Sequence, residues 1–140
     1  MKGEILPDHH HVSRYCKSTY APGGQIQATA FMLRKGEETL SVNWLEFLNC
    51  PNRENEITQL QNIYSKKLKI GTHAKIVVLN VGEVRNKVLE ESLDQRQLEV
   101  LHDPLTDDPS HSGIHNLKEA DELIAELFLE TVRETYSAHK

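Results

Sequence analysis

Three consecutive histidines, His9–His11, lie near the start of the chain and are followed closely by Ser13 and Arg14. If this stretch is extended, its side chains alternate, so that His9, His11 and Ser13 share one face. Imidazole binds zinc, copper and iron, and it also takes and gives protons near neutral pH. Histidine is abundant throughout, with eight in 140 residues. The stretch therefore predicts a histidine-centred site, either for a metal or for acid–base chemistry.

A divalent metal such as zinc is one cofactor that these residue types suit. A catalytic zinc site usually has three protein ligands, and a structural site has four. We expect His9 and His11 to supply two ligands, and His73, at the start of a predicted strand, to supply a third. Further candidates later in the chain are His102, Asp103, Asp108, His111 and His115.

Phosphoryl transfer without a metal is the second chemistry that the residues suit. One histidine can take a proton while another gives one, and an arginine can stabilise the charged oxygens. The predicted catalytic residues are His10, His11, Ser13, Arg14 and His111. In this set the histidines are acid–base groups, Arg14 binds the anion and the Ser13 hydroxyl holds phosphate.

The tripeptide at 11–13 also matches the H-x-[S/T] element of the two-histidine phosphoesterases, which need two such elements. The tripeptides at 73–75 and 111–113 lack the third-position hydroxyl, so membership of that family is not indicated. Two other interpretations stay open. The histidines are exposed loop residues, or Cys16 pairs with one of them as a nucleophile, although no oxyanion signature accompanies it.

The composition indicates a single globular domain over residues 1–140. The hydrophobic fraction is 38% and the charged fraction 26%, both ordinary values for a chain that buries a core. A net charge of −5 argues against a general nucleic-acid coat, which needs a broad basic surface. A local basic groove for a nucleotide or a nucleic-acid end stays open.

The cysteines and the apolar runs bear on the compartment. Cys16 and Cys50 are the two cysteines, and they do not form a C-x-x-C motif, so a disulfide framework is not expected. The first residues do not show the charged-then-apolar pattern of a signal segment, and the longest apolar run is far too short to span a membrane. We therefore expect a cytoplasmic protein with no membrane partner.

Hydrophobic periodicity predicts short strands and helices. Residues 26–34 and 39–44 favour strands on either side of Gly36, and so predict a β-hairpin. Apolar residues recur at helical spacing over 57–68, ahead of Gly71, which predicts a helix.

The second half of the chain predicts two more strands. Residues 73–81 have the continuous apolar centre of a strand buried on both faces, and 98–101 predict another. Residues 82–96 are ambiguous. Two Asp-Pro steps and a glycine predict a loop over 102–116.

The final segment, roughly 117–137, predicts an amphipathic helix. We expect Leu123, Leu127 and Phe128 to be buried against the sheet, and a dimer interface through the same stripe is the alternative. The fold class predicted is α+β: one mainly antiparallel sheet with two or three helices packed on it, and a C-terminal amphipathic helix.

Three stretches resemble a loose class of small uncharacterised proteins of bacterial or phage origin. They are HVSR at 11–14, AFMLRKGEETLSVNW at 30–44 and DPLTDDPSHSGI at 103–114. No activity is attached to that class. The resemblance therefore implies no catalytic residues, only a bacterial or phage cytoplasmic protein.

Two hypotheses for function follow. The first is a histidine-centred hydrolase or phosphotransferase, with or without a metal, that acts on a nucleotide or a nucleic-acid end. The second is a small non-catalytic binding or protein-interaction domain in which the histidine cluster is incidental. The first hypothesis requires the histidines at 9–11 to lie near His73 or His111 in the fold, and the second does not.

Overall fold

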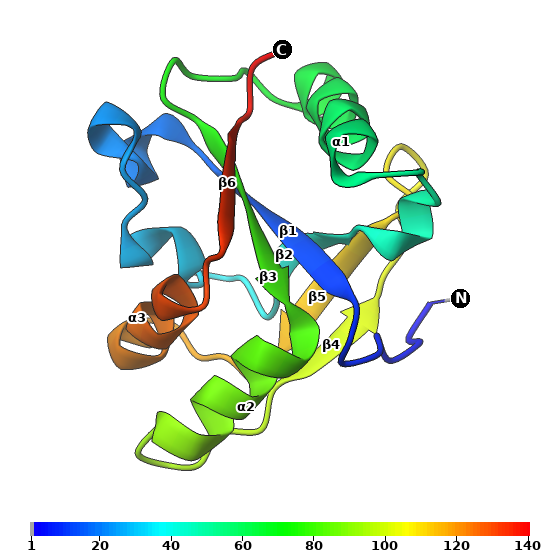
Figure 1. Ribbon diagram of the computed structural model, residues 1–140. Coiled ribbons are helices and arrows are strands. Elements are labelled where there is room, and N and C mark those ends of the chain that lie inside the picture. Colours follow the sequence, from blue (N-terminus) through cyan, green and yellow to red (C-terminus); the bar gives the residue numbers. More distant parts are fainter. Residues whose placement is uncertain (1) are drawn as a thin grey trace.

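The computed structural model describes residues 2–140, which form one six-stranded antiparallel sheet with three α-helices (Figure 1). The strand order is β4-β5-β2-β1-β3-β6. The strands are β1 (His11–Cys16), β2 (Leu40–Trp44), β3 (Lys75–Asn80), β4 (Glu99–His102), β5 (His111–His115) and β6 (Glu134–Ser137). The helices are α1 (Arg53–Lys67), α2 (Val81–Glu91) and α3 (Glu122–Glu130). The predicted α+β fold is confirmed.

Helices cover both faces of the sheet (Figure 1). On one face, α1 packs on Ile76 and Val78 of β3; on the other, α2 and α3 pack in a cluster with Val77 and Leu79. Alternate residues of a strand point to opposite faces, so a strand covered on both sides is apolar at every position. This explains the continuous apolar run predicted as a buried strand over 73–81, which forms β3.

Asparagine caps set the starts of two helices. The Asn52 side chain accepts a hydrogen bond from the backbone N–H of Asn55 at 2.9 Å, so α1 begins four residues before its first apolar position, Ile57. The Asn80 side chain accepts one from the N–H of Glu83 at 2.8 Å. This second cap places a helix in the ambiguous stretch after β3.

The predicted hairpin is wrong in its first strand. Residues 26–34 contain a short 3-10 helix, Ala28–Phe31, and β2 pairs with β1 and β5 instead. Phe31 is buried, and its ring stacks on Phe128 of α3 with 5.7 Å between centroids. Packing against α3 therefore overrides the local strand preference of this stretch.

The predicted loop over 102–116 is wrong in its second half: residues 103–110 connect two strands, but His111–His115 form β5, which lies inside the sheet between β4 and β2. This strand lacks a strong apolar pattern, since its buried residues are Ser112, Gly113 and Ile114. A Cβ on Gly113 would lie 3.1–3.2 Å from the side chain of Thr39. The close approach of Thr39 therefore favours glycine at position 113 over a larger residue.

The last helix is shorter than predicted. It ends at Glu130, and the residues after it form β6, which pairs with β3. Phe128 is fully buried, as predicted, and Leu127 is partly buried. Leu123 is 68% exposed, so the prediction of its burial is wrong. The buried stripe of α3 runs instead through Ile124, Ala125 and Phe128.

Among residues 2–140, no helix has both the length and the apolar character that a membrane crossing requires.

Candidate functional site

Strand register brings part of the predicted site together and separates the rest. Ser13 pairs with Asn43, and Asn43 pairs with His111, so these three residues form one row across β1, β2 and β5. Paired residues of neighbouring strands share a face, and Ser13 and His111 are therefore about 10 Å apart, two strand spacings. His11 pairs with Asn80, at one end of β3.

The three predicted metal ligands are not brought together. His73 precedes the first residue of β3, at the end of the β1–β3 pair opposite to His11, so about 17 Å or more separates them. His9 lies in the turn before β1 with its ring against that of His10. Within residues 2–140, no group of three or more His, Cys, Asp and Glu side chains is placed to hold a metal ion.

A cavity of about 380 Å³ opens where β1 and β2 separate. The two strands pair only at Val12 and Ser13 of β1, and beyond them Arg14 bridges the gap. Its Nε donates to the carbonyl of Ala30 at 2.9 Å, and its Nη1 donates to the carbonyl of Ser41 at 2.8 Å. The cavity is lined by Arg14, Tyr15, Lys17, Arg34, Glu37, Ser41, Asn43, Tyr64, Lys67, Leu68, Leu105, Asp108 and His111.

A buried chain of hydrogen bonds forms one wall of this cavity. The Tyr64 hydroxyl donates to Asn43 Oδ1 at 2.7 Å, and Asn43 Nδ2 donates to Asp108 Oδ1 at 2.7 Å. Lys67 Nζ lies 3.3 Å from the other oxygen of Asp108, and Ser13 Oγ lies 3.4 Å from the Tyr64 hydroxyl. Burial raises the pKa of Tyr64 far above neutrality, so its hydroxyl stays a donor. The wall is thus fixed in place.

Ser41 and His111 are in contact at the edge of the cavity. Ser41 Oγ lies 3.1 Å from Nε2 of His111, and Nδ1 of His111 lies 2.9 Å from the backbone carbonyl of Asp103. A carbonyl only accepts, so in the neutral ring Nδ1 carries the proton and Nε2 accepts from Ser41. An Asp103 carboxylate oxygen lies 3.8 Å from Nδ1. Serine beside an oriented imidazole is the arrangement of an activated nucleophile.

Ser41 was missed by sequence reasoning. It is an exposed serine on β2, 70 residues from His111, and no motif marks it. The two residues meet because β2 and β5 are neighbours, with Ser41 opposite Gly113 and His111 opposite Asn43. Since β5 was predicted as loop, the sequence held no signal for this pairing.

The cavity is locally cationic in an acidic chain. Four of its lining side chains are Lys or Arg, and two are carboxylates. The whole chain, by contrast, has a formal charge of −5. A concave site with convergent positive charge suits a small anion.

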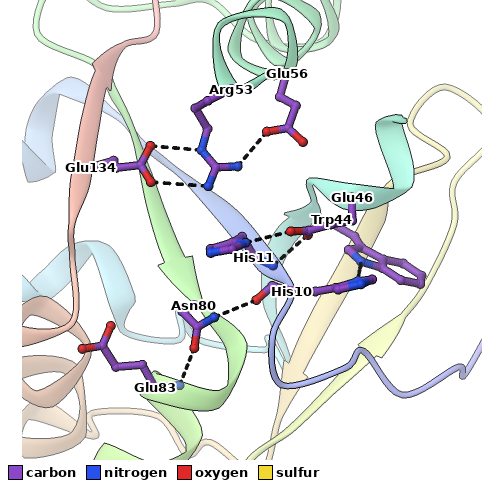
Figure 2. A network of polar contacts seen from close by, with 9 residues as sticks. All are labelled: His10, His11, Trp44, Glu46, Arg53, Glu56, Asn80, Glu83 and Glu134. Atoms are coloured by element: carbon purple, nitrogen blue, oxygen red, sulfur yellow. Dashed lines mark hydrogen bonds and ion pairs between the residues drawn. The ribbon is translucent and has the colours of Figure 1, made fainter. Parts of the chain in front are cut away.

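The other predicted catalytic histidines lie outside this cavity, and Figure 2 shows that they point to different partners. The histidines at 9–11 therefore share no site with His73 or His111, so the convergence that the first hypothesis expected is not found. His11 Nδ1 lies 2.7 Å from one carboxylate oxygen of Glu46, and the backbone N–H of His11 donates to the other at 2.7 Å (Figure 2). His10 Nδ1 accepts from the Trp44 indole N–H at 2.9 Å.

Carboxylates and one arginine surround His11. Arg53 Nε lies 3.0 Å from Glu134, and its Nη1 lies 2.6 Å from Glu56 (Figure 2). Burial alone would raise the pKa of Glu46, but the hydrogen bonds from the side chain and backbone of His11 outweigh burial and lower it. This His11 cluster is made of His11, Glu46, Arg53, Glu56 and Glu134, and its three carboxylates outnumber its one arginine.

Cys16 is not placed as a nucleophile. It is fully buried, and burial raises its pKa to about 12. A buried thiol that stays protonated at neutral pH is unreactive.

Comparison of the chain with protein-family models, with curated protein sequences and with solved structures found no match.

Proposed function

We propose that this chain is a hydrolase that cleaves a phosphate ester of a nucleotide or a nucleic-acid end, with Ser41 as nucleophile and His111 as general base. The observation that carries the proposal is the 3.1 Å contact between Ser41 Oγ and Nε2 of His111, inside a cavity lined by Arg14 and Lys67. His111 keeps the acid–base role predicted from the sequence, and Arg14 keeps the anion-binding role.

The reaction proceeds in two steps. First, Ser41 Oγ bonds to phosphorus and its proton passes to Nε2 of His111, while the departing alcohol, on the opposite side of phosphorus, takes a proton from solvent water as the P–O bond breaks. Then water bonds to phosphorus from that opposite side and loses a proton to solvent, and His111 returns its proton to Ser41 Oγ as the bond between Ser41 and phosphorus breaks. One water is consumed, and an alcohol and a phosphate are released.

The cations of the cavity favour a phosphate substrate. Arg14 lines the cavity and is held by the carbonyls of Ala30 and Ser41, and in this proposal its charge stabilises the negative oxygens of the transition state. Tyr15 lines the same cavity and offers an aromatic surface to a base. A volume of about 380 Å³ lies within the range of small-ligand pockets.

A reducing, cytoplasmic compartment is part of this proposal. Cys16 and Cys50 are both free thiols, which suits such a compartment.

Phosphate release from a substrate panel tests the proposal. The panel holds nucleoside 5′-monophosphates, 2′,3′-cyclic nucleotides and a short oligonucleotide with a terminal phosphate. We expect turnover of at least one substrate, abolished in Ser41→Ala and kept in the matched variant His115→Ala, which lies at the other end of β5 and outside the cavity. We also expect turnover to survive a chelator, because Ser41 and His111 supply the nucleophile.

Three results contradict the proposal. Turnover that persists in Ser41→Ala shows another nucleophile. Turnover that is lost with the chelator and restored by zinc shows that the reaction requires a metal. Nucleotide binding at the cavity without turnover of any substrate favours the second hypothesis, a non-catalytic binding domain.

A further inference from the structure

A second cavity, of about 640 Å³, lies between the end of α2 and the start of α3. These two helices are neighbours on the face of the sheet opposite to α1 (Figure 1). The groove is bounded by residues 91–96 on the α2 side and by residues 120–130 on the α3 side. It contains none of the residues that line the Ser41–His111 cavity.

Exposed apolar side chains form the floor of this groove. Leu93 is 93% exposed and Leu123 is 68% exposed, the two highest values among the large apolar side chains of residues 2–140. Leu127 continues the floor toward the core. A soluble chain seldom leaves large apolar side chains this exposed and adjacent unless they bind something.

Carboxylates form the rim. Six of the thirteen lining residues are Asp or Glu, and one is Arg. That arginine, Arg96, is already held by Asp94 at 2.8 Å and by Asp121 at 3.0 Å. Within the part of the chain that the structure describes, Glu122 and Glu126 have no ion-pair partner. The rim therefore carries uncompensated negative charge, which repels nucleic acid and attracts cations.

We propose that this groove binds a lysine- or arginine-rich amphipathic helix of a partner protein. The apolar stripe of such a helix covers Leu93, Leu123 and Leu127, and its cationic flanks meet the carboxylates of the rim. Charge complementarity selects this occupant over a second copy of the chain, which brings its own net charge of −5. The inference is independent of the proposed hydrolysis, because the two cavities share no residue.

Peptide binding to the full chain tests the inference. The probe is a dye-labelled Leu/Lys peptide of ~18 residues, about five helical turns, with leucines at i, i+3, i+4 and i+7. One control peptide has Glu in place of every Lys, and another has the same composition scrambled to destroy the stripe. Fluorescence anisotropy measures affinity, and light scattering measures the mass of the chain alone.

The proposal expects the Leu/Lys peptide to bind and both control peptides to bind at least about tenfold more weakly, because each lacks the charge or the stripe. Leu93→Ser with Leu123→Ser weakens binding by about tenfold or more, since two apolar contacts are lost. Glu122→Gln with Glu126→Gln weakens it about fivefold, as the loss of two exposed ion pairs predicts.

Matched charge changes elsewhere decide whether binding is specific. Glu38→Gln with Glu99→Gln removes the same charge from exposed positions outside the groove. Equal weakening by this control pair overturns the proposal, because binding then follows net charge alone. Equal binding of the scrambled peptide overturns it too. A dimer of the chain that Leu93→Ser with Leu123→Ser dissociates also overturns it, since the occupant is then a second copy.

Discussion

His11 and His111 each have a ring held by a hydrogen bond, and their surroundings differ. His11 lies beside Glu46 in a cluster where carboxylates predominate and Arg53 pairs with both Glu56 and Glu134. His111 lies beside Ser41, in a cavity lined mainly by cations. Both rings are held by a hydrogen bond at Nδ1. Of these two rings, His111 is the one whose Nε2 contacts a hydroxyl, that of Ser41. The partner of the second ring nitrogen is therefore the feature on which we base the proposed role of His111.

The charge around each histidine supports this division. In the His11 cluster, burial alone would raise the pKa of Glu134, but the hydrogen bonds from Tyr136 and Arg53 lower it. The hydrogen bonds from His11 lower the pKa of Glu46 in the same way. Such carboxylates stabilise the fold in their ionised form. In the Ser41–His111 cavity, the cations exceed the carboxylates, so there is charge left to bind a ligand.

The largest expected effect is on activity, in a pair of alanine substitutions. His111→Ala should lower kcat/KM by about 10²–10⁴-fold, the usual contribution of a general base. His11→Ala should leave kcat/KM nearly unchanged. Thermal melting checks that both variants are folded.

Equal loss of activity in both variants breaks the comparison, because both histidines then belong to one mechanism. Loss of activity in His11→Ala alone reverses the comparison, because the reactive histidine is then His11, beside Glu46.

The next effect is on stability, in a pair of tyrosines. Tyr64→Phe removes the donor that satisfies Asn43 Oδ1 in the buried wall of the cavity. An unsatisfied buried acceptor should lower the free energy of unfolding by about 1–3 kcal/mol. Tyr136→Phe instead removes a hydroxyl that donates to the partly exposed Glu134. This change should lower the free energy of unfolding by less than about 1 kcal/mol. Urea denaturation measures both, and the reverse order would show that the cavity wall is not fixed.

A smaller effect depends on pH. In the folded chain the pKa of Glu46 is lowered from its ordinary value of 4.5. Ionised Glu46 therefore stabilises the fold fully above pH 4.5, and this stabilisation is lost as the pH falls through the folded pKa. Glu46→Gln should therefore cost up to about 1 kcal/mol at pH 7 and progressively less below pH 4.5. Urea denaturation over this pH range measures the difference. A difference that does not change with pH would show that ionised Glu46 does not stabilise the fold.

The smallest effect concerns the thiols. Cys16 is fully buried with a pKa of about 12, whereas Cys50 is partly exposed. Iodoacetamide at neutral pH should modify Cys50 and leave Cys16 unmodified until the chain is unfolded. Peptide mass mapping detects both sites. Rapid modification of Cys16 in the folded chain would reopen the interpretation of this residue as a nucleophile.

The sequence predicted the elements whose patterns are local. The helical spacing from Ile57 to Leu68 gave α1, and the β-branched run of β3 gave a buried strand, because both patterns need no distant partner. The stretch around Phe31 and the strand β5 were missed, since their structure depends on α3 and on neighbouring strands. Long-range packing decides such segments.

For the candidate site, the sequence predicted residue types but not all of their partners. Arg14 and His111 were named, and both line the cavity, but clustering in sequence drew attention to His10 and His11, which do not. Ser41 has no local signal, because it is placed by the pairing of β2 with β5. Strand register cannot be read from a strand as weakly patterned as β5.

Covalent labelling tests the proposed role of Ser41 as nucleophile most directly. A fluorophosphonate probe reacts with an activated serine, which bonds to phosphorus as fluoride leaves, and intact mass with peptide mapping locates the adduct. The Ser41–His111 contact of 3.1 Å predicts one adduct, on Ser41, that is absent in His111→Ala and unchanged in His11→Ala. An unlabelled chain, or an adduct on Ser41 that forms equally well in His111→Ala, would contradict the assignment of Ser41 as a nucleophile activated by His111.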